Sequence, residues 1–337
     1  MRQFLLGIDI GGTKCSVVIG KAIKPDKMEI QDKISFPTEN ERGVNHVVEQ
    51  LFSRIEQLLV CRGMRVEDLY AAGVSCGGPL DEKDGIIMNP PNLPGWNKVR
   101  ITKMIEERFG IRAKLQNDAN ACALAEWKYG AARGYNNVVF LTFGTGLGAG
   151  LILDGKLYTG TNGMAGEVGH IRLAEFGAVG YGKAGSFEGF CSGGGIAQLA
   201  RMKALERFQS GECCAFCPDI AHLNAITAKT VAESAFAGDQ TALEVFETCG
   251  RFLGHGLAVL IDILAPEIIV IGSIYERSQK LLAAEMEKTL LKEAHPKMLA
   301  ACRIAPAALK DEIGDYASLA VADILSESEM RDISVPF

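Results

Sequence analysis

Apolar residues recur along the chain with two periods, one typical of strands and one typical of helices. Phe4 to Ile10 is a nearly continuous apolar run closed by Gly-Gly-Thr, and Cys15 to Ile19 is a second apolar run after that turn. The pair predicts a strand hairpin with a glycine turn. Glu41 to Cys61 carries apolar residues at three-and-four spacing, which predicts an amphipathic helix with Asn40 as its N-cap.

Strand and helix patterns of this kind continue through the chain. Further strands are expected at Leu69 to Ser75, Ile111 to Gln116, Phe140 to Phe143, Leu151 to Leu153 and Glu267 to Ile271. Further helices are expected at Asn117 to Tyr129, Ser192 to Phe208, Ala228 to Ala237, Leu243 to Leu264 and Glu276 to Lys292. Gln209 to Pro218, with three cysteines, is expected to be a surface excursion between helices. Interspersed strands and helices predict an α/β protein.

The second half of the chain opens like the first. Phe140 to Phe143 runs into Gly144-Thr-Gly146, a further apolar run and then Gly155-Lys156, as Phe4 to Lys21 does in the first half. Such self-similarity suggests a duplicated unit. The length of 337 residues also suits two domains better than one.

Composition and charge exclude several classes of protein. Hydrophobic residues make up 48% and charged residues 23%, which argues against intrinsic disorder and against a coiled coil. Lys and Arg number 35 against 41 Asp and Glu, so the net charge of -6 lacks the basic excess that nucleic-acid binding requires. A nucleic-acid partner is therefore not expected.

No membrane partner is expected either. Two apolar stretches could be mistaken for membrane spans. Gly134 to Leu153 is uncharged but is interrupted by glycines, and Gly256 to Ile274 contains Asp262, Pro266 and Glu267, which a lipid-facing helix would not tolerate. The apolar patch before Asp9 is too short for a secretory signal, so a cytoplasmic location is predicted. The ten cysteines are accordingly expected as reduced thiols.

The glycine turns are candidates for phosphate binding. Backbone N–H groups in such a turn can form a concave nest for phosphate oxygens, although a plain hairpin has the same composition. The recurrence of the turn favours phosphate binding, because two turns facing each other across a cleft would hold a polyphosphate from two sides. Asp9 is a charge inside an apolar strand just before the first turn, and its predicted partner is a metal ion bound to that phosphate.

Polar residues mark two further positions. Asn117-Asp118-Ala119-Asn120 lies where a strand gives way to a helix, so Asp118 is either a helix cap or a general base that takes a proton from a substrate hydroxyl. Glu167, His170 and Glu188 lie in a glycine-rich region, and a solvated loop would have the same composition.

Ser75 raises the alternative that the protein is a serine hydrolase. Gly73-Val-Ser-Cys-Gly77 matches the nucleophile elbow of serine hydrolases and follows a strand. Gly78 and Pro79 then lead into an irregular stretch where the elbow requires a helix, which disfavours a hydrolase.

Four motifs together resemble the ROK family of bacterial sugar kinases and repressors. They are Gly7 to Lys14, Asn117 to Asn120, Thr142 to Gly148 and Gly166 to His170, and they occur in the family's order over nearly the whole chain. The resemblance implies an actin-like ATPase (ribonuclease H-like) fold, an α/β fold with two lobes and a central cleft for ATP. Residues 1–117 with about 312–337 would form the small lobe and residues 118–311 the large one.

The resemblance also implies roles for single residues. Residues that match ATP-binding positions are Asp9, Gly11, Gly12, Thr13, Lys14, Gly144, Thr145, Gly146, Gly272 and Ser273, with Ser273 in place of a second glycine. Asp118 matches the catalytic base. Residues that match sugar-binding positions are Gly77, Gly78, Asn117, Asp118, Glu167, His170 and Glu188. ATP and Mg²⁺ would be the cofactors, with Asp9 as a magnesium ligand, and a homodimer is expected.

The activity implied is glucokinase-like, the ATP-dependent phosphorylation of a hexose or N-acetylhexosamine hydroxyl. Which sugar is phosphorylated stays open. The alternative is a sugar- or ATP-binding sensor or scaffold protein without turnover. The family's repressors carry an amino-terminal helix-turn-helix segment, whereas the phosphate motif here begins at residue 7, so DNA binding is not expected.

One departure from the family pattern concerns zinc. Val179, Tyr181 and Ser186 stand where three cysteines of the family's zinc site would be, so no zinc site is expected there. Packing around Val179, Tyr181 and Phe187 is predicted to hold His170 and Glu188 instead. Whether Cys213, Cys214 and Cys217, with His222, bind a metal stays open, since their spacing is irregular.

Overall fold

The chain forms two compact units. A computed structural model describes residues 4–24 and 26–333. Contacts group Met1–Gly134, Leu157–Met164 and Ala308–Phe337 into the first unit, and Tyr135–Lys156 with Ala165–Ala307 into the second. Within the described ranges, no helix is both long and apolar enough to cross a membrane.

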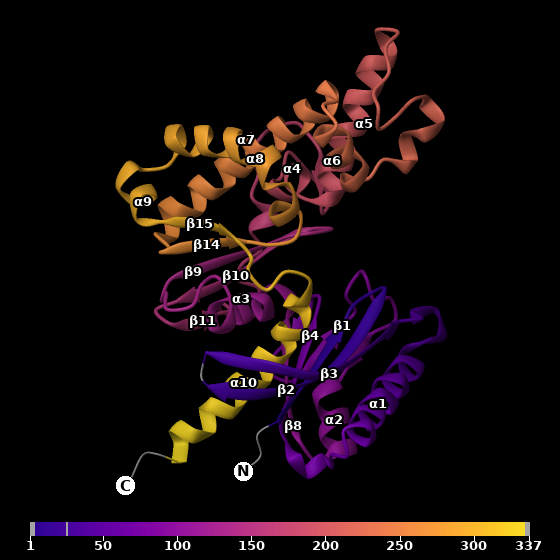
Figure 1. The fold of residues 1–337 in the computed structure, drawn as a ribbon, viewed down its shortest axis with the longest axis vertical. Helices are drawn as coiled ribbons and strands as arrows, with labels where there is room; N and C mark the ends of the chain where they lie inside the picture. Colours follow the sequence, from indigo (N-terminus) through magenta and orange to yellow (C-terminus); the bar gives the residue numbers. More distant parts are fainter. Residues whose placement is uncertain (1–3, 25, 334–337) are drawn as a thin grey trace. The chain divides into compact units, whose positions relative to one another are not determined.

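A five-stranded sheet forms the centre of the first unit, in the order β3-β2-β1-β4-β8 (Figure 1). Its strands are β1 (Phe4–Ile10), β2 (Lys14–Lys24), β3 (Lys27–Pro37), β4 (Leu69–Cys76) and β8 (Arg112–Asn117). The first three are antiparallel neighbours, which confirms the predicted hairpin, and β4 and β8 continue the sheet in parallel to β1. No residue range was predicted for β3, because its polar residues hide the alternation.

Side chains of β1 alternate between two cores. Leu6, Ile8 and Ile10 pack in the core that contains the helices α1 (Val44–Cys61) and α2 (Ile101–Phe109), whereas Leu5 faces α10 (Ile313–Ile333). Figure 1 shows α1 and α2 on one side of this sheet and α10 on the other. A small sheet of β5 (Leu80–Asp81), β6 (Ile86–Met88) and β7 (Asn97–Val99) completes the unit.

The predicted cap of the first helix is wrong. A short 3-10 helix, Asn40–Arg42, precedes α1, and Gly43 is the N-cap without a side-chain hydrogen bond. The Asn40 side chain instead accepts a hydrogen bond from Trp96 Nε1 at 2.8 Å and donates one to the Pro94 carbonyl at 2.9 Å. A distant buried tryptophan thus uses the polar group that a local pattern assigns to the helix.

The predicted lobe boundary differs from the contact units at one helix. α3 (Asp118–Tyr129) packs against α10 in the first unit, where Lys128 Nζ and Asp323 Oδ2 form a buried ion pair at 2.5 Å. The prediction assigned this helix to the large lobe. The division into functional lobes stays a prediction.

Close packing of α10 on the sheet depends on glycine. A Cβ at Gly73 would lie 2.1 Å from the Ser318 carbonyl oxygen and 2.4 Å from Ala322 N, and one at Gly7 would lie 2.4 Å from Ser318 Oγ. Because backbone atoms of α10 meet the centre of the sheet there, a larger residue must displace the helix.

We expect Gly73→Ala to lower the free energy of unfolding by about 3 kcal/mol, because the added methyl group overpacks this contact. Urea denaturation measures the change. Gly63→Ala is the matched control: its Cβ meets no atom within 4 Å, and its φ of +60° should cost only about 1 kcal/mol. Equal losses in the two variants would contradict the role of Gly73.

The second unit contains another five-stranded sheet, in the order β11-β10-β9-β14-β15. Its strands are β9 (Val138–Phe143), β10 (Leu147–Leu153), β11 (Lys156–Tyr158), β14 (Ile268–Ile271) and β15 (Arg303–Pro306). β9 and β10 form an antiparallel hairpin, and β14 and β15 run parallel to β9. The two sheets therefore share strand order, and β10, β9, β14 and β15 run in the same relative directions as β2, β1, β4 and β8, which agrees with the predicted duplication.

Helices complete the second unit. They are α4 (Phe187–Phe190), α5 (Gly193–Gln209), α6 (Ala228–Phe236), α7 (Gln240–Leu264), α8 (Ile274–Glu293) and α9 (Pro296–Ala301). α7 and α8 pack closely along each other, as Figure 1 shows. A glycine on α7 permits one contact with α4, since a Cβ at Gly256 would lie 2.2 Å from the Phe187 ring.

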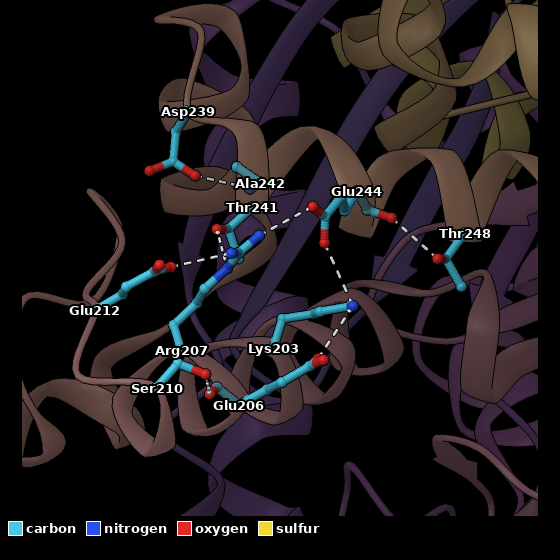
Figure 2. A network of polar contacts seen from close by, with 10 residues as sticks. All are labelled: Lys203, Glu206, Arg207, Ser210, Glu212, Asp239, Thr241, Ala242, Glu244 and Thr248. Carbon is cyan, nitrogen blue, oxygen red and sulfur yellow. Dashed lines mark hydrogen bonds and ion pairs between the residues drawn. The ribbon is translucent and has the colours of Figure 1, made fainter.

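A polar network joins α5 to α7 (Figure 2). Arg207 donates hydrogen bonds to Thr241 Oγ1 at 3.1 Å, to Glu212 at 3.0 Å and to Glu244 at 3.0 Å. Asp239 caps α7 by accepting from Ala242 N at 2.8 Å.

The segment between α5 and α6 is more buried than predicted. Asp239 also accepts from Ala215 N at 2.7 Å, which fixes the cysteine-containing turn to the start of α7. Cys213 is exposed, as a surface excursion requires, but Cys214 and Cys217 are buried in the core of the second unit. The expected surface excursion is therefore only partly correct, because apolar side chains of this segment fill the core.

Candidate active site

The predicted residues of the first unit meet at one edge of its sheet. The carboxyl ends of the parallel strands β1, β4 and β8 share this edge, where Ile10 pairs with Cys76 and Cys76 with Asn117. Asp9 lies near the end of β1, Gly77 and Gly78 directly follow β4, and Asp118 directly follows β8. Ligands of open α/β sheets bind at such edges.

Asp9 has an unusual electrostatic environment. Burial, with the nearby Asp118 and Asp315 carboxylates, raises the pKa of Asp9 from 3.8 to about 7, although the Ser75 hydroxyl and Lys14 oppose the rise. Asp315 itself is paired with Lys33 Nζ at 2.5 Å. Ser75 lies within β4 and is only 2% exposed, and its hydroxyl hydrogen bonds to Asp9. A serine buried inside a strand does not match the strand-to-helix elbow of a hydrolase.

Asp118 is the first residue of α3. Its Oδ1 accepts a hydrogen bond from Ala119 N at 2.8 Å, and the N-cap is Asn117, whose Oδ1 accepts from the same N–H at 3.0 Å. The surrounding protein raises the pKa of Asp118 by desolvation, while the side chain stays open to solvent. A carboxylate of raised pKa that a substrate can reach is suited to accept a proton.

Sequence reasoning missed Asn92 at this edge. A Cβ at Gly12 would lie 2.5 Å from the Asn92 carbonyl oxygen, and one at Gly77 would lie 3.4 Å from Asn92 Nδ2. The buried Trp96 anchors the loop that carries Asn92. No local pattern marks Asn92, because long-range contacts bring its loop to the first glycine turn.

The oxygen groups of this edge fit a magnesium ion. Mg²⁺ commonly binds one or two carboxylates together with phosphate oxygens, and the Asp118 charge lies close enough to raise the pKa of Asp9. Within the described residues, no group of three or more His, Cys, Asp or Glu side chains forms a metal site.

The second glycine turn joins β9 to β10 in the second unit. Gly144 N donates to the Gly146 carbonyl at 3.1 Å, and the start of α5 packs against the turn, with Gly193 N donating to the Gly144 carbonyl at 2.8 Å. Ser192 caps α5 through Gly195 N at 2.9 Å. Helix N-termini favour anions, so α5 adds positive potential to this turn. The run Ser192 to Gly195 at the start of the predicted helix is the signal that could have identified this feature.

Glu188 is attached to the same turn. Its Oε2 accepts from Leu147 N at 3.0 Å, and its Cβ would lie 3.2 Å from a Cβ at Gly169. Glu167 and His170 flank this glycine in the 3-10 turn Val168–His170 and its N-cap. The second unit thus brings Glu167, His170 and Glu188 close to the Gly144–Gly146 turn.

Packing does not hold the glycine-rich loop as predicted. Phe187 is fully buried, but Val179 is 43% exposed and Tyr181 74% exposed, although the Tyr181 ring contacts His170 edge-on at 5.4 Å. The prediction is therefore wrong for Val179, whereas the exposed Tyr181 does pack against His170.

Hydrogen bonds hold this loop instead. The Gln198 side chain of α5 accepts from Val179 N at 2.9 Å and donates to the Val179 carbonyl at 2.8 Å. Lys183 Nζ donates to the His170 carbonyl at 2.7 Å, and Ser186 caps α4 through Gly189 N at 3.1 Å. Hydrogen bonds from side chains to backbone groups thus fix the loop, where apolar contacts were expected from the sequence.

We predict that the purified protein contains far less than one zinc ion per chain, because Val179, Tyr181 and Ser186 supply no thiolate ligands. Elemental analysis of protein purified without added zinc measures the content, and a chelator should leave the melting temperature unchanged. Stoichiometric zinc would refute this prediction, and a Cys214→Ser variant would then show whether the cysteine-containing turn binds it.

Gly272 and Ser273 lie between β14 and α8, close to the second turn. A Cβ at Gly144 would lie 3.8 Å from Ser273 Oγ, so the two predicted ATP-binding segments of this unit are neighbours. Ser273 has φ of +56° and ψ of -107°, a conformation that favours glycine. The serine at this position is therefore strained.

We expect Ser273→Gly to raise the free energy of unfolding by about 1 kcal/mol, because glycine adopts this conformation without strain. Chemical denaturation measures the gain. Ser273→Ala is the matched control, since it removes the hydroxyl but retains the Cβ and should give no stabilisation. A gain in the alanine variant equal to that in the glycine variant would disprove the strain.

Comparison with known proteins identifies the family. Residues 5–322 match the model of the ROK family. The chain belongs to the ROK family. The glucokinase of Halalkalibacterium halodurans is 30% identical over 314 residues, which cover 93% of this chain and 92% of that protein. The resemblance of the four motifs is thereby confirmed.

Solved structures of ROK proteins share the fold. The ROK hexokinase from Thermus thermophilus superposes with a TM-score of 0.76 at 27% identity, covering 96% of this chain and 99% of that one. A ROK family glucokinase from Streptomyces griseus in complex with glucose and AMPPNP gives 0.73 at 26% identity, covering 95% and 99%. The actin-like ATPase fold predicted for this ROK protein is therefore confirmed.

Repressors belong to the same family. The DNA-binding transcriptional repressor Mlc of Escherichia coli is 24% identical over 251 residues, which cover 74% of this chain and 60% of Mlc. Family membership alone therefore does not establish turnover.

Proposed function

We propose that this ROK protein is a sugar kinase that transfers the γ-phosphoryl group of ATP to a hydroxyl of a hexose or N-acetylhexosamine. One observation carries the proposal: Asp118, accessible and with a raised pKa, lies at the strand–helix junction beside Asp9. Similarity to glucokinases at 30% identity supports the same activity. The homodimer and the cytoplasmic location stay predictions.

Asp118 acts as the general base in this proposal. It accepts the proton of the sugar hydroxyl while the oxygen attacks the γ-phosphorus in line. Because the transition state for phosphoryl transfer is loose, positioning and charge neutralisation provide most of the acceleration. A magnesium ion bound with ATP at Asp9 would neutralise phosphate charge.

The remaining predicted residues bind the two substrates. Backbone N–H groups of the two glycine turns, with Lys14, would hold the phosphates, and Gly272 and Ser273 would contact the adenosine. Asn117, Glu167, His170, Glu188 and the turn Gly77-Gly78 would bind sugar hydroxyls. A polar group left unpaired by the wrong sugar costs more than a missing apolar contact, so these residues would select the substrate.

The second candidate is a sensor or scaffold protein that binds sugar or ATP without turnover. The similarity to Mlc favours it. Damage to Asp9, Asp118 or a glycine turn would be expected in such a protein, and all three are present.

The deciding experiment measures ADP release from magnesium ATP with a panel of hexoses and N-acetylhexosamines. Turnover with one sugar, lost in Asp118→Asn, would establish the kinase and its substrate. ATP binding without turnover for any sugar would refute the kinase and favour the sensor.

A further inference from the structure

A tyrosine lies at the tip of a small hairpin in the second unit. The hairpin pairs β12 (Val179–Gly180) with β13 (Lys183–Ala184), and Tyr181 and Gly182 form the turn between the two strands. The Tyr181 side chain is 74% exposed, so most of its ring can meet a ligand. Aromatic side chains stabilise a protein mainly through buried area, and this ring buries little.

The backbone at Tyr181 is strained. Its φ is +45° and that of Gly182 is +76°, so both residues have the positive φ of a type I′ turn. Such turns favour Asn or Gly at both positions, because a larger side chain is disfavoured at positive φ. Tyrosine at the first position therefore destabilises the turn without a compensating gain from burial. Strained residues of this kind cluster at ligand-binding sites.

Hydrogen bonds fix the base of the hairpin on both strands. On β12, the Gln198 side chain accepts from Val179 N at 2.9 Å and donates to the Val179 carbonyl at 2.8 Å. On β13, Lys183 Nζ donates to the His170 carbonyl at 2.7 Å. Because both strands are held, the turn presents the Tyr181 ring in a defined position.

Predicted sugar-binding residues lie against this hairpin. The rings of Tyr181 and His170 meet edge-on, with 5.4 Å between their centroids and 68° between their planes. Gly180 packs against Glu188, since a Cβ at Gly180 would lie 2.8 Å from Glu188 Cβ. His170 and Glu167 are themselves exposed. The ring of Tyr181 thus adds an apolar surface to a group of polar side chains.

A pyranose ring presents both kinds of surface to a protein. Its hydroxyl groups lie around the edge of the ring and form hydrogen bonds, whereas its axial C–H groups form an apolar face. The face of an aromatic ring carries partial negative charge and attracts such C–H groups. Ligand sites commonly combine aromatic side chains with a few polar groups that fix the orientation of the ligand.

We propose that Tyr181 is a sugar-binding residue, whose ring stacks on the C–H face of the sugar while His170 and Glu188 bind its hydroxyl groups. The proposal rests on the sugar binding in the function proposed above. Tyr181 selects for a pyranose with an unobstructed C–H face, and the polar residues select the orientation of its hydroxyls. Contact with the sugar offsets the strain of the turn.

Isothermal titration with glucose, mannose, N-acetylglucosamine and N-acetylmannosamine tests the proposal. Tyr181→Asn should raise the Kd of the bound sugar about fivefold to tenfold, because the stacking contact is lost. Asparagine suits the first position of a type I′ turn, so the hairpin should keep its shape. Tyr181→Phe retains the ring, and its Kd should stay within about twofold of the wild type.

Phe176→Ala is the matched control for the loss of an exposed aromatic side chain. Phe176 lies outside the turn and is 82% exposed, and its variant should bind sugar like the wild type. Equal sugar affinity of Tyr181→Asn and the wild type would overturn the proposal, as would a wild type that binds none of the four sugars.

Thermal unfolding distinguishes sugar binding from a structural role. Without ligand, Tyr181→Asn should melt about 2 °C above the wild type, because the strain of the turn is relieved. A structural role would instead lower the melting temperature and leave the Kd of the folded protein unchanged, and that result would overturn the proposal.

Turnover measurements separate this inference from the kinase function. In an active kinase, Tyr181→Asn should raise the sugar KM about fivefold to tenfold and leave kcat and the ATP KM within about twofold. Sugar binding that weakens in Tyr181→Asn, in a protein that phosphorylates no sugar, would support the inference and refute the kinase alone. Phosphorylation with an unchanged sugar KM in this variant would refute the inference alone.

Discussion

Asp118→Asn is expected to lower kcat for sugar phosphorylation by about a hundred to ten thousandfold, the range that a general base contributes. Asparagine has the size and shape of aspartate and can still accept the Ala119 N–H, so the start of α3 should stay intact. It lacks the basicity to accept a proton from the sugar. The loss should therefore appear in kcat, while sugar binding weakens little.

Steady-state kinetics with isothermal titration of the sugar separates these effects. Asp84→Asn, an exposed carboxylate away from the junction, is the control for a lost negative charge and should retain full activity. A variant that loses sugar binding at unchanged kcat would show that Asp118 binds substrate and is not the base.

The parts of the site that could be predicted from the sequence belong to local strand, turn and helix patterns. Asp9 lies inside an apolar strand that the Gly11-Gly12 turn follows, and Asp118 stands where a strand gives way to a helix. Strand order then brings these residues to one edge, because β1, β4 and β8 are parallel neighbours. Periodicity and turn composition are local properties, so the sequence contains them in readable form.

The parts that could not be predicted depend on contacts between distant segments. Asn92 reaches the first glycine turn because the buried Trp96 fixes its loop. Asn40 has the composition of a helix cap but hydrogen bonds to Trp96. Gln198 holds Val179 by a pair of backbone hydrogen bonds that no spacing rule indicates.

Asp9→Asn is expected to stabilise the ligand-free protein above neutral pH, although it should weaken binding of magnesium ATP. The pKa of Asp9 is about 7 in the folded protein, against 3.8 for an ordinary aspartate. Between these values the folded state binds more protons than the unfolded state, so the free energy of unfolding falls as the pH rises from about 4 to about 7. One pKa unit corresponds to about 1.4 kcal/mol, so ionised Asp9 lowers the free energy of unfolding by up to about 4 kcal/mol.

Urea denaturation between pH 4 and pH 8, without nucleotide or magnesium, measures this effect. Wild type and Asp9→Asn should be similar near pH 4, where Asp9 is protonated, and should diverge above pH 7 in favour of the variant. Asp118 also has a raised pKa, so the variant should retain part of the downward slope, and Asp84→Asn should follow the wild type. A variant less stable than the wild type at pH 8 would show that ionised Asp9 stabilises the ligand-free protein. That result would contradict the proposal that the Asp9 carboxylate is a ligand for a bound cation. Magnesium ATP should raise the free energy of unfolding more in the wild type than in the variant, because only an ionised Asp9 interacts favourably with the bound cation.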